Sequence, residues 1–512
     1  MLVKILGSAV DGISANTITI EVNISSGVHF FLVGLPDNAV KESQHRMLSA
    51  LTSNGFRWPG QRIIVNMAPA DVRKEGSAYD LPIAIGILAA SEQINYENVE
   101  NFIIMGELSL DGTIKPIKGA LPIAINAKEQ GYKAIILPNE NTKEAAVVEG
   151  IDVYGANHIM DLVKFFNKES DLEKVTVDLE KEFLNEKEEY DLDFSDVKGQ
   201  ENVKRALEIA AAGGHNIILI GPPGAGKTML AKRIPGILPP LTIEEAIETT
   251  KIHSVAGKTE AGHALIRTRP FRSPHHTISD VALVGGGAYP QPGEISMAHN
   301  GVLFLDELPE FKRSVLEVMR QPMEERIVTI SRAKFSVEYP TSFMLVASMN
   351  PCPCGFYNHP DKECTCSQGV VQRYLNKISG PLLDRIDIHL EVTPVNFDKL
   401  SDIKPGEKSI DIQKRVIKAR QIQYERFKNK KNIHCNAQMN SKQIKEFCKL
   451  SDDSLVLVKN AMEKLDLSAR AYDRIIKLSR TIADIENSED IKALHVAEAI
   501  HYRSLDRESW GS

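Results

Sequence analysis

The stretch NIILIGPPGAGKTML, residues 216–230, constrains this 512-residue chain more than any other. Its apolar run at 217–220 predicts a buried strand, and the residues after Thr228 continue as a helix. Between them, a G-x-x-x-x-G-K-T pattern lets backbone N–H groups turn inward around phosphates, with Lys227 charging the β and γ oxygens and Thr228 ligating Mg²⁺. The sequence therefore predicts a site for ATP and Mg²⁺. The loop residues expected to contact the nucleotide are Gly221, Pro222, Pro223, Gly224, Ala225, Gly226, Lys227, Thr228 and Met229.

A second strand pattern ends in two carboxylates. GVLFLDE, residues 301–307, places Asp306 and Glu307 directly after four apolar residues. A carboxylate at the position of Asp306 holds Mg²⁺ together with Thr228, and one at the position of Glu307 polarises the attacking water. This motif is common alone, but downstream of the phosphate-binding loop it predicts a hydrolytic site.

Two further segments resemble the AAA+ ATPases. FMLVASMN, residues 343–350, is similar to the strand that carries the sensor 1 residue, which implies that Asn350 lies beside the γ-phosphate. GPLLDRIDIH, residues 380–389, resembles the segment of the arginine finger, so Arg385 would reach the nucleotide of a neighbouring subunit. The alternatives are an ordinary turn residue for Asn350 and a surface ion pair for Arg385.

The C-terminal part contains an amphipathic pattern, LSARAYDRIIKLSRTIADI, with Ser468 as the expected N-cap. Arg470 falls in the first turn, where the helix dipole does not stabilise a cation. It matches the sensor 2 position of the AAA+ lid, with Arg474 as the alternative. The segment DFSDVKGQENVKRAL resembles the part of AAA+ proteins that covers the adenine. Its expected nucleotide contacts are Val197, Gly199 and Gln200.

The sequence between these motifs narrows the resemblance. RPFRSPHHTISDVALVGGGAYPQPGEISMAHNGVLFLDE looks like the magnesium-chelatase ATPase branch, and ERIVTISRAKFSVEYP looks like its hairpin before sensor 1. APADVRKEGSAYDLPIAIGIL and MGELSLDGTIKPIKG resemble the proteolytic domain of Lon. This order of segments resembles the YifB/ComM family over essentially the whole chain.

The resemblance and the composition together predict an α/β multidomain protein. We expect a ribosomal-S5-domain-2-like, Lon-protease-like α+β domain at 1–165 and a charged linker at 166–192. A P-loop AAA+ parallel-sheet domain follows at 193–400, and a helical lid domain at 401–512.

The Lon-like domain departs from Lon where peptidase chemistry requires a hydroxyl and an amine. The nucleophile position falls on Ala78, with Ser77 one place early, and the lysine position falls on Ile123. A Ser–Lys dyad cannot form from alanine and isoleucine. We therefore expect no peptidase activity, unless Lys118 and Ser77 form a dyad instead. The more plausible role of this domain is oligomer scaffolding or DNA contact.

The family resemblance implies a homo-oligomeric ring, hexameric in such proteins, that hydrolyses ATP and drives branch migration on DNA. The net charge of −7 means that any DNA contact must be local. Residues 414–431 carry eight Lys or Arg, which bind DNA or form a solvated helix face. RTRPFRSPHHT, residues 267–277, either faces the central pore of the ring or folds as a rigid local turn.

A competing function is a chelatase-like motor that remodels a partner protein without nucleic acid. No apolar run approaches the length of about 18 residues that spans a bilayer, and no export signal is evident at the start. We therefore expect a cytoplasmic protein with no membrane association.

Four of the six cysteines lie directly after Asn350, in NPCPCGFYNHPDKECTC. Cys352, Cys354, Cys364 and Cys366 supply enough thiolates for a tetrahedral Zn²⁺ site, with His359 as a substitute ligand. The single-residue spacing within each pair is shorter than in most zinc knuckles, so reduced, uncoordinated thiols are the alternative. A disulfide is the least favoured interpretation in a reducing compartment.

Overall fold

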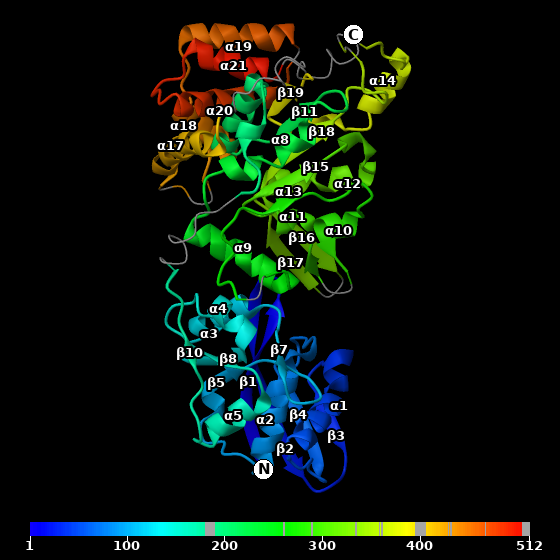
Figure 1. The fold of residues 1–512 in the computed structure, drawn as a ribbon, viewed down its shortest axis with the longest axis vertical. Helices are drawn as coiled ribbons and strands as arrows, with labels where there is room; N and C mark the ends of the chain where they lie inside the picture. The colour runs from blue at the N-terminus through cyan, green and yellow to red at the C-terminus, as the bar shows by residue number, and fades with distance from the viewer. Residues whose placement is uncertain are drawn as a thin grey trace.

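The computed structural model describes most of the chain and shows an elongated molecule with the N-terminal domain at one end and a helical region at the other (Figure 1). The described residues are 1–179, 190–259, 262–287, 290–332, 335–357, 359, 362–394, 406–428, 430, 433–465 and 467–503.

The N-terminal domain is built on a mixed eight-stranded sheet with the order β10-β9-β8-β5-β1-β2-β4-β3. Antiparallel pairing joins β1 to β2 and β2 to β4, whereas β1, β5, β8 and β9 run parallel. The strands are β1 Leu2–Asp11, β2 Ser14–Ser25, β3 Phe30–Val33, β4 Arg62–Ala68, β5 Phe102–Ile104, β8 Ala134–Pro138, β9 Asp152–Ala156 and β10 Lys174–Val175, with a small hairpin of β6 Glu107–Leu108 and β7 Ile114–Lys115.

The helices of this domain pack on the sheet. They are α1 Asn38–Ser53, α2 Asp80–Ala90, α3 Ala120–Glu129, α4 Thr142–Ala145 and α5 Ile159–Phe166. Every residue of α2 is buried, which explains why its sequence is apolar on all sides. Its one acidic residue, Asp80, is buried in an ion pair with Arg46 at 2.6 Å.

The central domain contains a five-stranded, all-parallel sheet with the order β12-β15-β18-β11-β19. Its strands are β11 Ile217–Ile220, β12 Phe271–Arg272, β15 Val302–Leu305, β18 Met344–Met349 and β19 Ile388–Glu391. The described core strands are buried runs, as expected for a parallel sheet covered on both faces. Parallel strands bring the P-loop, the Asp306–Glu307 pair and Asn350 to the same edge.

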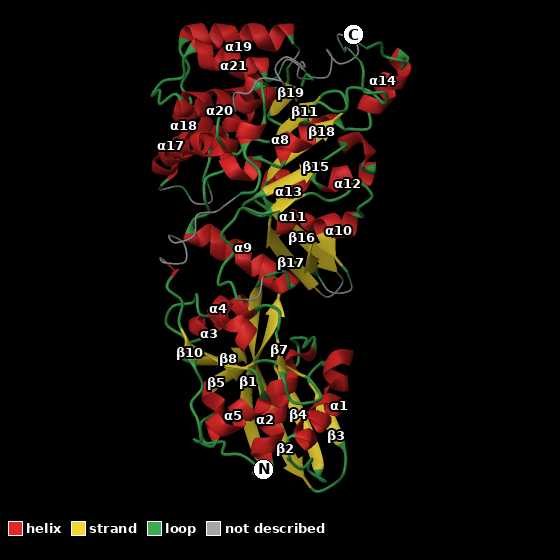
Figure 2. Cartoon of the chain, viewed as in Figure 1, coloured by secondary structure: helices red, strands yellow, loops and turns green. Residues whose placement is uncertain are grey.

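Helices surround this sheet, and a hairpin projects from it towards the N-terminal domain (Figure 2). The helices are α7 Glu201–Gly213, α8 Lys227–Ala231, α9 Ile243–Ala256, α10 Asp280–Val284, α11 Glu294–Met297, α12 Arg313–Val318, α13 Arg320–Glu325, α14 Gln368–Leu375 and α15 Gly380–Leu383. The hairpin pairs β16 Ile327–Arg332 with β17 Phe335–Pro340, and a shorter one pairs β13 Gly285–Gly286 with β14 Gln291–Pro292.

The C-terminal region is helical in its described residues. Its helices are α17 Ser409–Phe427, α18 Ser441–Phe447, α19 Asp452–Lys464, α20 Ala469–Ile485 and α21 Ala493–His501. The Ser468 side chain accepts a hydrogen bond from the Ala471 amide at 3.2 Å, which confirms the predicted N-cap of α20. The apolar faces of α17, α20 and α21 share one core with the central sheet.

The predicted fold class is confirmed: a mixed-sheet domain, a parallel-sheet domain and a helical region follow one another along the chain. The exact domain limits stay predictions. Residues 180–189 of the predicted linker and the limit at 400 lie outside the described residues. Among the helices that the structure describes, none is long and apolar enough to cross a membrane.

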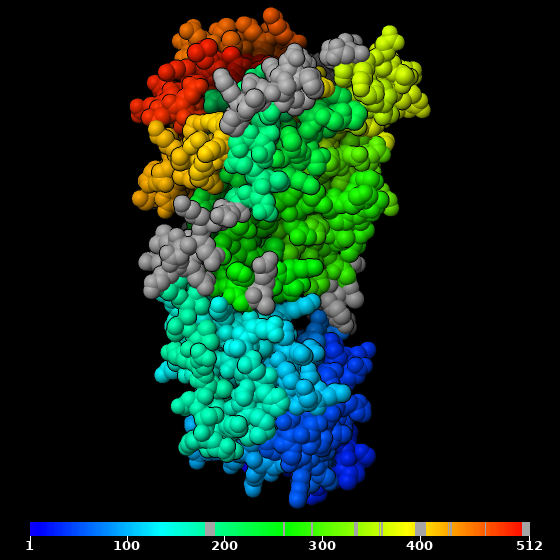
Figure 3. Space-filling view, viewed as in Figure 1, coloured from blue at the N-terminus to red at the C-terminus, as the bar shows by residue number. Residues whose placement is uncertain are grey.

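The N-terminal domain contacts the central domain directly, as the space-filling view shows (Figure 3). The Gly119 amide, before α3, donates to the Ser254 carbonyl of α9 at 3.2 Å. Gly12, in the β1–β2 turn at φ 60°, lies so close to Val337 of β17 that a Cβ there would be 2.4 Å from a valine methyl. The turn therefore fits the hairpin only with glycine at this position.

Candidate nucleotide site

The phosphate-binding loop begins where β11 ends. A Cβ on Gly221 would lie 2.2 Å from the Val392 carbonyl oxygen, so only glycine allows this approach. Gly224 and Gly226 have φ values of 81° and 86°, a left-handed backbone that glycine adopts without strain. The predicted strand and the helix that follows are both present, with α8 beginning at Lys227.

Lys227 lies under this loop. Its ammonium group donates to the carbonyl oxygens of Gly221 at 2.7 Å and Pro222 at 3.0 Å, and to the Asn350 side-chain oxygen at 3.1 Å. Burial lowers the pKa of Lys227, while the nearby Asp306 and Glu307 carboxylates act in the opposite direction. The structure thus joins the P-loop and the predicted sensor 1 residue through one lysine.

The two predicted Mg²⁺ ligands meet at the end of β15. The Thr228 hydroxyl donates to one Asp306 carboxylate oxygen at 2.6 Å. The Ser348 hydroxyl of β18 donates to the other oxygen. A hydroxyl and a carboxylate side by side at a phosphate-binding loop fit the donor set of Mg²⁺, which prefers oxygen ligands. Ser348 is a member of this site that sequence reasoning missed, although it stands two positions before Asn350.

Glu307 follows with an unusual backbone. Its φ of 54° is left-handed, which is uncommon for a residue with a side chain and turns the carboxylate out of the strand direction. The side chain is 59% exposed, and one carboxylate oxygen lies 3.6 Å from Nδ1 of His276. His276 belongs to the RTRPFRSPHHT segment, where the predicted roles did not include contact with Glu307.

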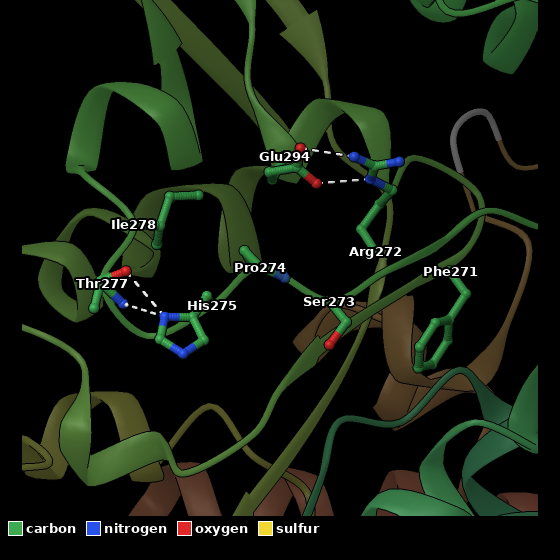
Figure 4. Close-up of a pocket in the computed structure, with 8 residues that line it drawn as sticks. All are labelled: Phe271, Arg272, Ser273, Pro274, His275, Thr277, Ile278 and Glu294. Carbon is green, nitrogen blue, oxygen red and sulfur yellow. Dashed lines mark hydrogen bonds and ion pairs between the residues drawn. The ribbon is translucent and has the colours of Figure 1, made fainter.

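Two arginines of that segment are tied to the domain itself. Arg269 donates to Glu245 at 2.8 Å and to the Asn300 carbonyl at 2.7 Å. Arg272 forms a two-point ion pair with Glu294 at 2.6 and 2.7 Å (Figure 4). These arginines therefore serve local folding, which is one of the two predicted roles for the segment.

The cysteine segment packs against the phosphate-binding loop. A Cβ on Gly355 would lie 2.4 Å from Cδ of Pro223. Cys352 is fully buried in a core that includes residues of β15 and β18. The segment therefore touches the nucleotide site at both Asn350 and Pro223.

The four cysteines converge. The Sγ atom of Cys352 lies 3.3 Å from that of Cys354 and 3.7 Å from that of Cys364, and all four ligand atoms lie within 4.8 Å of one another. Four thiolates on one tetrahedral Zn²⁺ have sulfurs about 3.8 Å apart, because each Zn–S bond is about 2.3 Å. The geometry fits a tetrathiolate site. His359 is not part of this group of described residues and instead packs its ring against Phe356.

The segment expected to cover the adenine connects two parts of the site. Gln200, in a left-handed conformation at φ 57°, donates to the carbonyl oxygens of Ala225 and Thr393, both at 3.0 Å. Val197 is buried and Gly199 also has a positive φ of 66°. Gln200 thereby ties the phosphate-binding loop to the chain after β19.

Arg385 is buried within its own subunit. Its guanidinium lies 2.5 Å from a Glu324 carboxylate oxygen and donates to the Pro381 carbonyl at 2.5 Å, and its side chain is 7% exposed. An ion pair was the alternative that the sequence offered to an arginine finger, but it was expected at the surface, whereas the Arg385 side chain is buried. The predicted role across a subunit contact stays a prediction.

The two arginines of α20 differ in their surroundings. Arg470 is exposed in the first turn of the helix. Arg474 pairs with Asp387, which also lies 3.4 Å from the His215 ring and accepts from the Asn216 amide at 3.0 Å. Burial disfavours the Asp387 carboxylate, but Arg474 and His215 outweigh it and hold its pKa well below the usual range. Arg474 thus fixes α20 to the segment that carries Arg385.

The basic residues of α17 are largely occupied by carboxylates of the same chain. Arg415 pairs with Glu208 at 2.6 Å and with Glu407 at 2.5 Å, and Arg426 forms a two-point pair with the buried Asp484. These intramolecular ion pairs favour the helix-face interpretation over DNA binding for Arg415 and Arg426. Residues 429 and 431 of the stretch lie outside the described residues.

The Lon-like corner contains no Ser–Lys pair. The Ser77 hydroxyl donates to Glu107. Lys118 lies instead at the domain contact, where its methylene groups approach Gly257. Ile123 is buried in the core at 1% exposure, and Ala78 packs against the same core.

The parallel sheet and this constellation of side chains define a P-loop ATPase. The family profile for magnesium chelatase, subunit ChlI, matches residues 193–400. The profile for subunit ChlI of Mg-chelatase matches residues 20–141, and the profile for the C-terminal part of subunit ChlI matches residues 406–503. The chain is 45% identical to the competence protein ComM of Haemophilus influenzae over 97% of its length and 96% of that protein.

A similar match extends beyond one organism. The chain is also 45% identical to the protein YifB of Escherichia coli over 97% of its length and 96% of that protein. A shorter stretch of 159 residues is 33% identical to Lon protease 2 of Bacillus subtilis and covers 28% of this chain and 27% of that one. The chain belongs to the ComM/YifB family of Mg-chelatase-like ATPases, and this family implies ATP and Mg²⁺ as its cofactors.

Proposed function

We propose that the protein is an ATP-driven ring motor that acts on DNA and drives branch migration while incoming DNA is integrated. One observation carries this proposal: the chain matches a competence protein over 97% of its length, from the N-terminal domain to the helical region. The contacts among Lys227, Asn350, Thr228 and Asp306 in the same chain support ATP hydrolysis as the source of energy.

The geometry supports ATP hydrolysis by the residues already described. Lys227 would exchange its two carbonyl contacts for phosphate oxygens, because these contacts already hold its ammonium group at the loop. Thr228 and Asp306 would hold Mg²⁺, which neutralises charge on the phosphates when MgATP is bound. Glu307 would orient and polarise the attacking water, and Asn350 would fix its position from the neighbouring strand.

The test compares ATP hydrolysis with and without DNA. We expect a four-way junction to stimulate the ATPase more than a linear duplex of equal length, and a fluorescently labelled junction to be resolved only with ATP. Lys227→Ala and Glu307→Gln should abolish both activities. Lys232→Ala, which removes an exposed lysine five positions further along, is the matched control and should behave like the wild type.

Glu307→Gln separates binding from turnover. Because it removes only the charge that polarises water, the variant should still bind ATP and DNA. If the folded wild-type protein neither binds DNA at low salt nor shows DNA-stimulated ATPase, the proposal fails. Low salt is the sensitive condition, because contacts to DNA phosphates weaken steeply as salt rises.

The second candidate function is a motor that remodels a partner protein. It is favoured by the family profiles, which carry the name of the magnesium chelatase subunit. Such a motor should hydrolyse ATP at the same rate with and without DNA. The DNA comparison therefore decides between the two candidates.

We propose a homo-oligomeric ring, hexameric as in related ATPases, in which Arg385 completes the nucleotide site of the next subunit. Arg385 would have to leave Glu324 to do so, since its guanidinium is buried in that pair. Light scattering with and without a non-hydrolysable ATP analogue measures the mass of the assembly. Only the monomer mass under both conditions would contradict the ring.

We also propose that the four cysteines hold a structural Zn²⁺. The convergence of their sulfurs and the contact between Gly355 and Pro223 support this role, because a metal there would stiffen the chain between Asn350 and the P-loop. Protein purified without chelator should contain about one zinc per chain, and Cys364→Ser should lower that content. Cys448→Ala, a buried cysteine of the helical region, is the control. A wild-type content below about half a zinc per chain would contradict the site.

A further inference from the structure

One hydroxyl group lies in a strand that is otherwise apolar. Strand β18 runs between β15 and β11, and all six of its residues are buried. Five of them are methionine, leucine, valine or alanine, and the sixth is Ser348, which is fully buried. Because a buried hydroxyl without a hydrogen-bond partner destabilises a fold, the partner of Ser348 shows what the serine does there.

That partner is the carboxylate of Asp306. The parallel register of β15 and β18 continues up to the residue before each of the two side chains, so both lie at the same end of the sheet. The Ser348 hydroxyl donates to Oδ1 of Asp306, which also accepts from the Glu307 amide at 3.1 Å. The other oxygen, Oδ2, accepts from the Thr228 hydroxyl at 2.6 Å. One oxygen is therefore held from behind, and the other faces the phosphate-binding loop.

This arrangement limits what Asp306 offers to a cation. Mg²⁺ requires a nearly ideal octahedron of oxygens and keeps several waters, whereas Ca²⁺ takes more ligands and binds both oxygens of one carboxylate readily. Because Oδ1 is occupied by Ser348 and the Glu307 amide, Asp306 presents the single oxygen Oδ2. Groups that orient a metal ligand from behind contribute to metal affinity in proteins generally.

We propose that Ser348 is a positioning residue that presents Oδ2 of Asp306 to Mg²⁺ and thereby gives the site its preference for Mg²⁺ over Ca²⁺. The inference rests on the proposed function, in which Thr228 and Asp306 hold Mg²⁺. Ser348 and Asn350 are two positions apart, so one end of β18 sends a polar side chain to Asp306 and another to Lys227. Ser348 acts through Asp306 and not on the nucleotide itself.

The test measures binding of a fluorescent, non-hydrolysable ATP analogue to the full-length protein while free Mg²⁺ or Ca²⁺ is titrated. Ser348→Ala should raise the half-saturating Mg²⁺ concentration about three- to tenfold, because one hydrogen bond to the carboxylate is lost. The half-saturating Ca²⁺ concentration should change by less than about twofold, since Ca²⁺ can use the freed oxygen. Binding in EDTA should stay unchanged, because Lys227 and the loop contact the phosphates without the cation. General damage to the site would weaken binding under all three conditions.

Two further variants and a control separate the hydroxyl from the packing of the strand. Ser348→Thr keeps the hydroxyl on a β-branched side chain that suits a strand, so it should retain the wild-type selectivity. Ser348→Cys fills the space but donates weakly, so it should lose selectivity even if the alanine variant folds poorly. Ser296→Ala removes another fully buried hydroxyl, one without a hydrogen-bond partner among the described residues, and should leave the selectivity unchanged.

Asp306→Asn distinguishes a failure of this inference from a failure of the proposed function. It should raise the half-saturating Mg²⁺ concentration by about tenfold or more. If Asp306→Asn has this effect while Ser348→Ala and Ser348→Cys keep the wild-type ratio of Mg²⁺ to Ca²⁺, the positioning role is overturned and the metal ligands stand. If Asp306→Asn changes the requirement for neither cation, the proposed metal ligands are wrong and the inference fails with them.

Discussion

Two lysines, one in each of the first two domains, each donate to carbonyl oxygens of the turn that precedes them, but they serve different purposes. Lys74 donates to the carbonyl oxygens of Pro69 and Val72, and its side chain is fully buried. Lys227 also donates to two carbonyl oxygens, but its third partner is the Asn350 side chain from another strand. Burial lowers the pKa of both ammonium groups.

The difference lies in what can replace the contacts. The Lys74 turn is closed, so its ammonium group serves only to satisfy buried carbonyl oxygens. The Lys227 turn is formed by glycines and has exposed residues at Pro223 and Gly224, so a phosphate can approach. A lysine therefore becomes a ligand-binding group when the backbone around it is open, and a structural group when it is closed.

Exchanging each lysine for alanine gives the largest expected effect. Lys227→Ala should lower kcat/KM for ATP by about 10³-fold or more, because both phosphate binding and charge stabilisation are lost. Lys74→Ala should instead reduce the free energy of unfolding by about 1–3 kcal/mol, since two buried carbonyl oxygens lose their donor. ATPase rates per folded molecule and thermal denaturation measure the two effects. A large loss of ATPase in folded Lys74→Ala protein would remove the distinction.

Arg385 tests whether a buried, paired cation can still act at the nucleotide. Its contact with Glu324 resembles the closed surroundings of Lys74. If it serves a neighbouring subunit, Arg385→Ala should lower kcat by about 10²-fold, because one charge that stabilises the transferring phosphoryl group is lost.

A mixing experiment locates that effect. Inactive Lys227→Ala subunits retain Arg385, and Arg385→Ala subunits retain Lys227, so a mixture should recover activity if the arginine acts between subunits. Mixtures that stay at the sum of the two separate rates would place Arg385 in a structural role. The control is a mixture of Lys227→Ala with Glu307→Gln, which should not recover.

Local features of the central domain and of the helical region could be predicted from sequence. The apolar runs at 217–220 and 302–305 coincide with β11 and β15, because strand burial is encoded by neighbouring residues. The cap of α20 at Ser468 is equally local. The convergence of the four cysteines follows from their short separation along the chain.

Contacts between distant segments could not be predicted in the same way. Arg385 with Glu324, Arg415 with Glu208 and His276 with Glu307 each depend on how elements pack, and the sequence contains many carboxylates that could pair with each cation. Ser348 was hidden for a related reason. A serine in a buried strand has no pattern of its own until Asp306 is placed beside it.

Helix α9, which lies at the contact between the N-terminal and central domains, provides a pH-dependent prediction. His253 of α9 is buried, and burial lowers its pKa from 6.5 to about 4, with its ring 3.1 Å from the Met297 carbonyl oxygen. The unfolded chain therefore binds more protons than the folded one between these values, so stability falls as the pH falls through this window. We expect a loss of about 2 kcal/mol by about pH 5 from this group.

Thermal denaturation of the wild type and His253→Gln across that range measures the effect. The glutamine variant should lose part of the decline, because its side chain does not titrate. Equal declines in the two proteins would assign the acid sensitivity to other groups. Since α9 contacts α3 of the N-terminal domain, amide hydrogen exchange in α3 at low pH shows whether the domain contact weakens too.

Ser77 gives the smallest expected effect and completes the comparison within the N-terminal domain. Its hydroxyl donates to Glu107, and the nearby Lys74 ammonium group is engaged with carbonyl oxygens. Activation of a serine requires a base that can take its proton, and a lysine fixed in a closed turn cannot approach. Ser77→Ala should therefore leave ATP hydrolysis unchanged. Neither the wild type nor the variant should cleave a fluorogenic casein substrate. Casein cleavage by the wild type that disappears in Ser77→Ala would show that the closed turn opens, and Lys74 would then belong with Lys227 as a functional group.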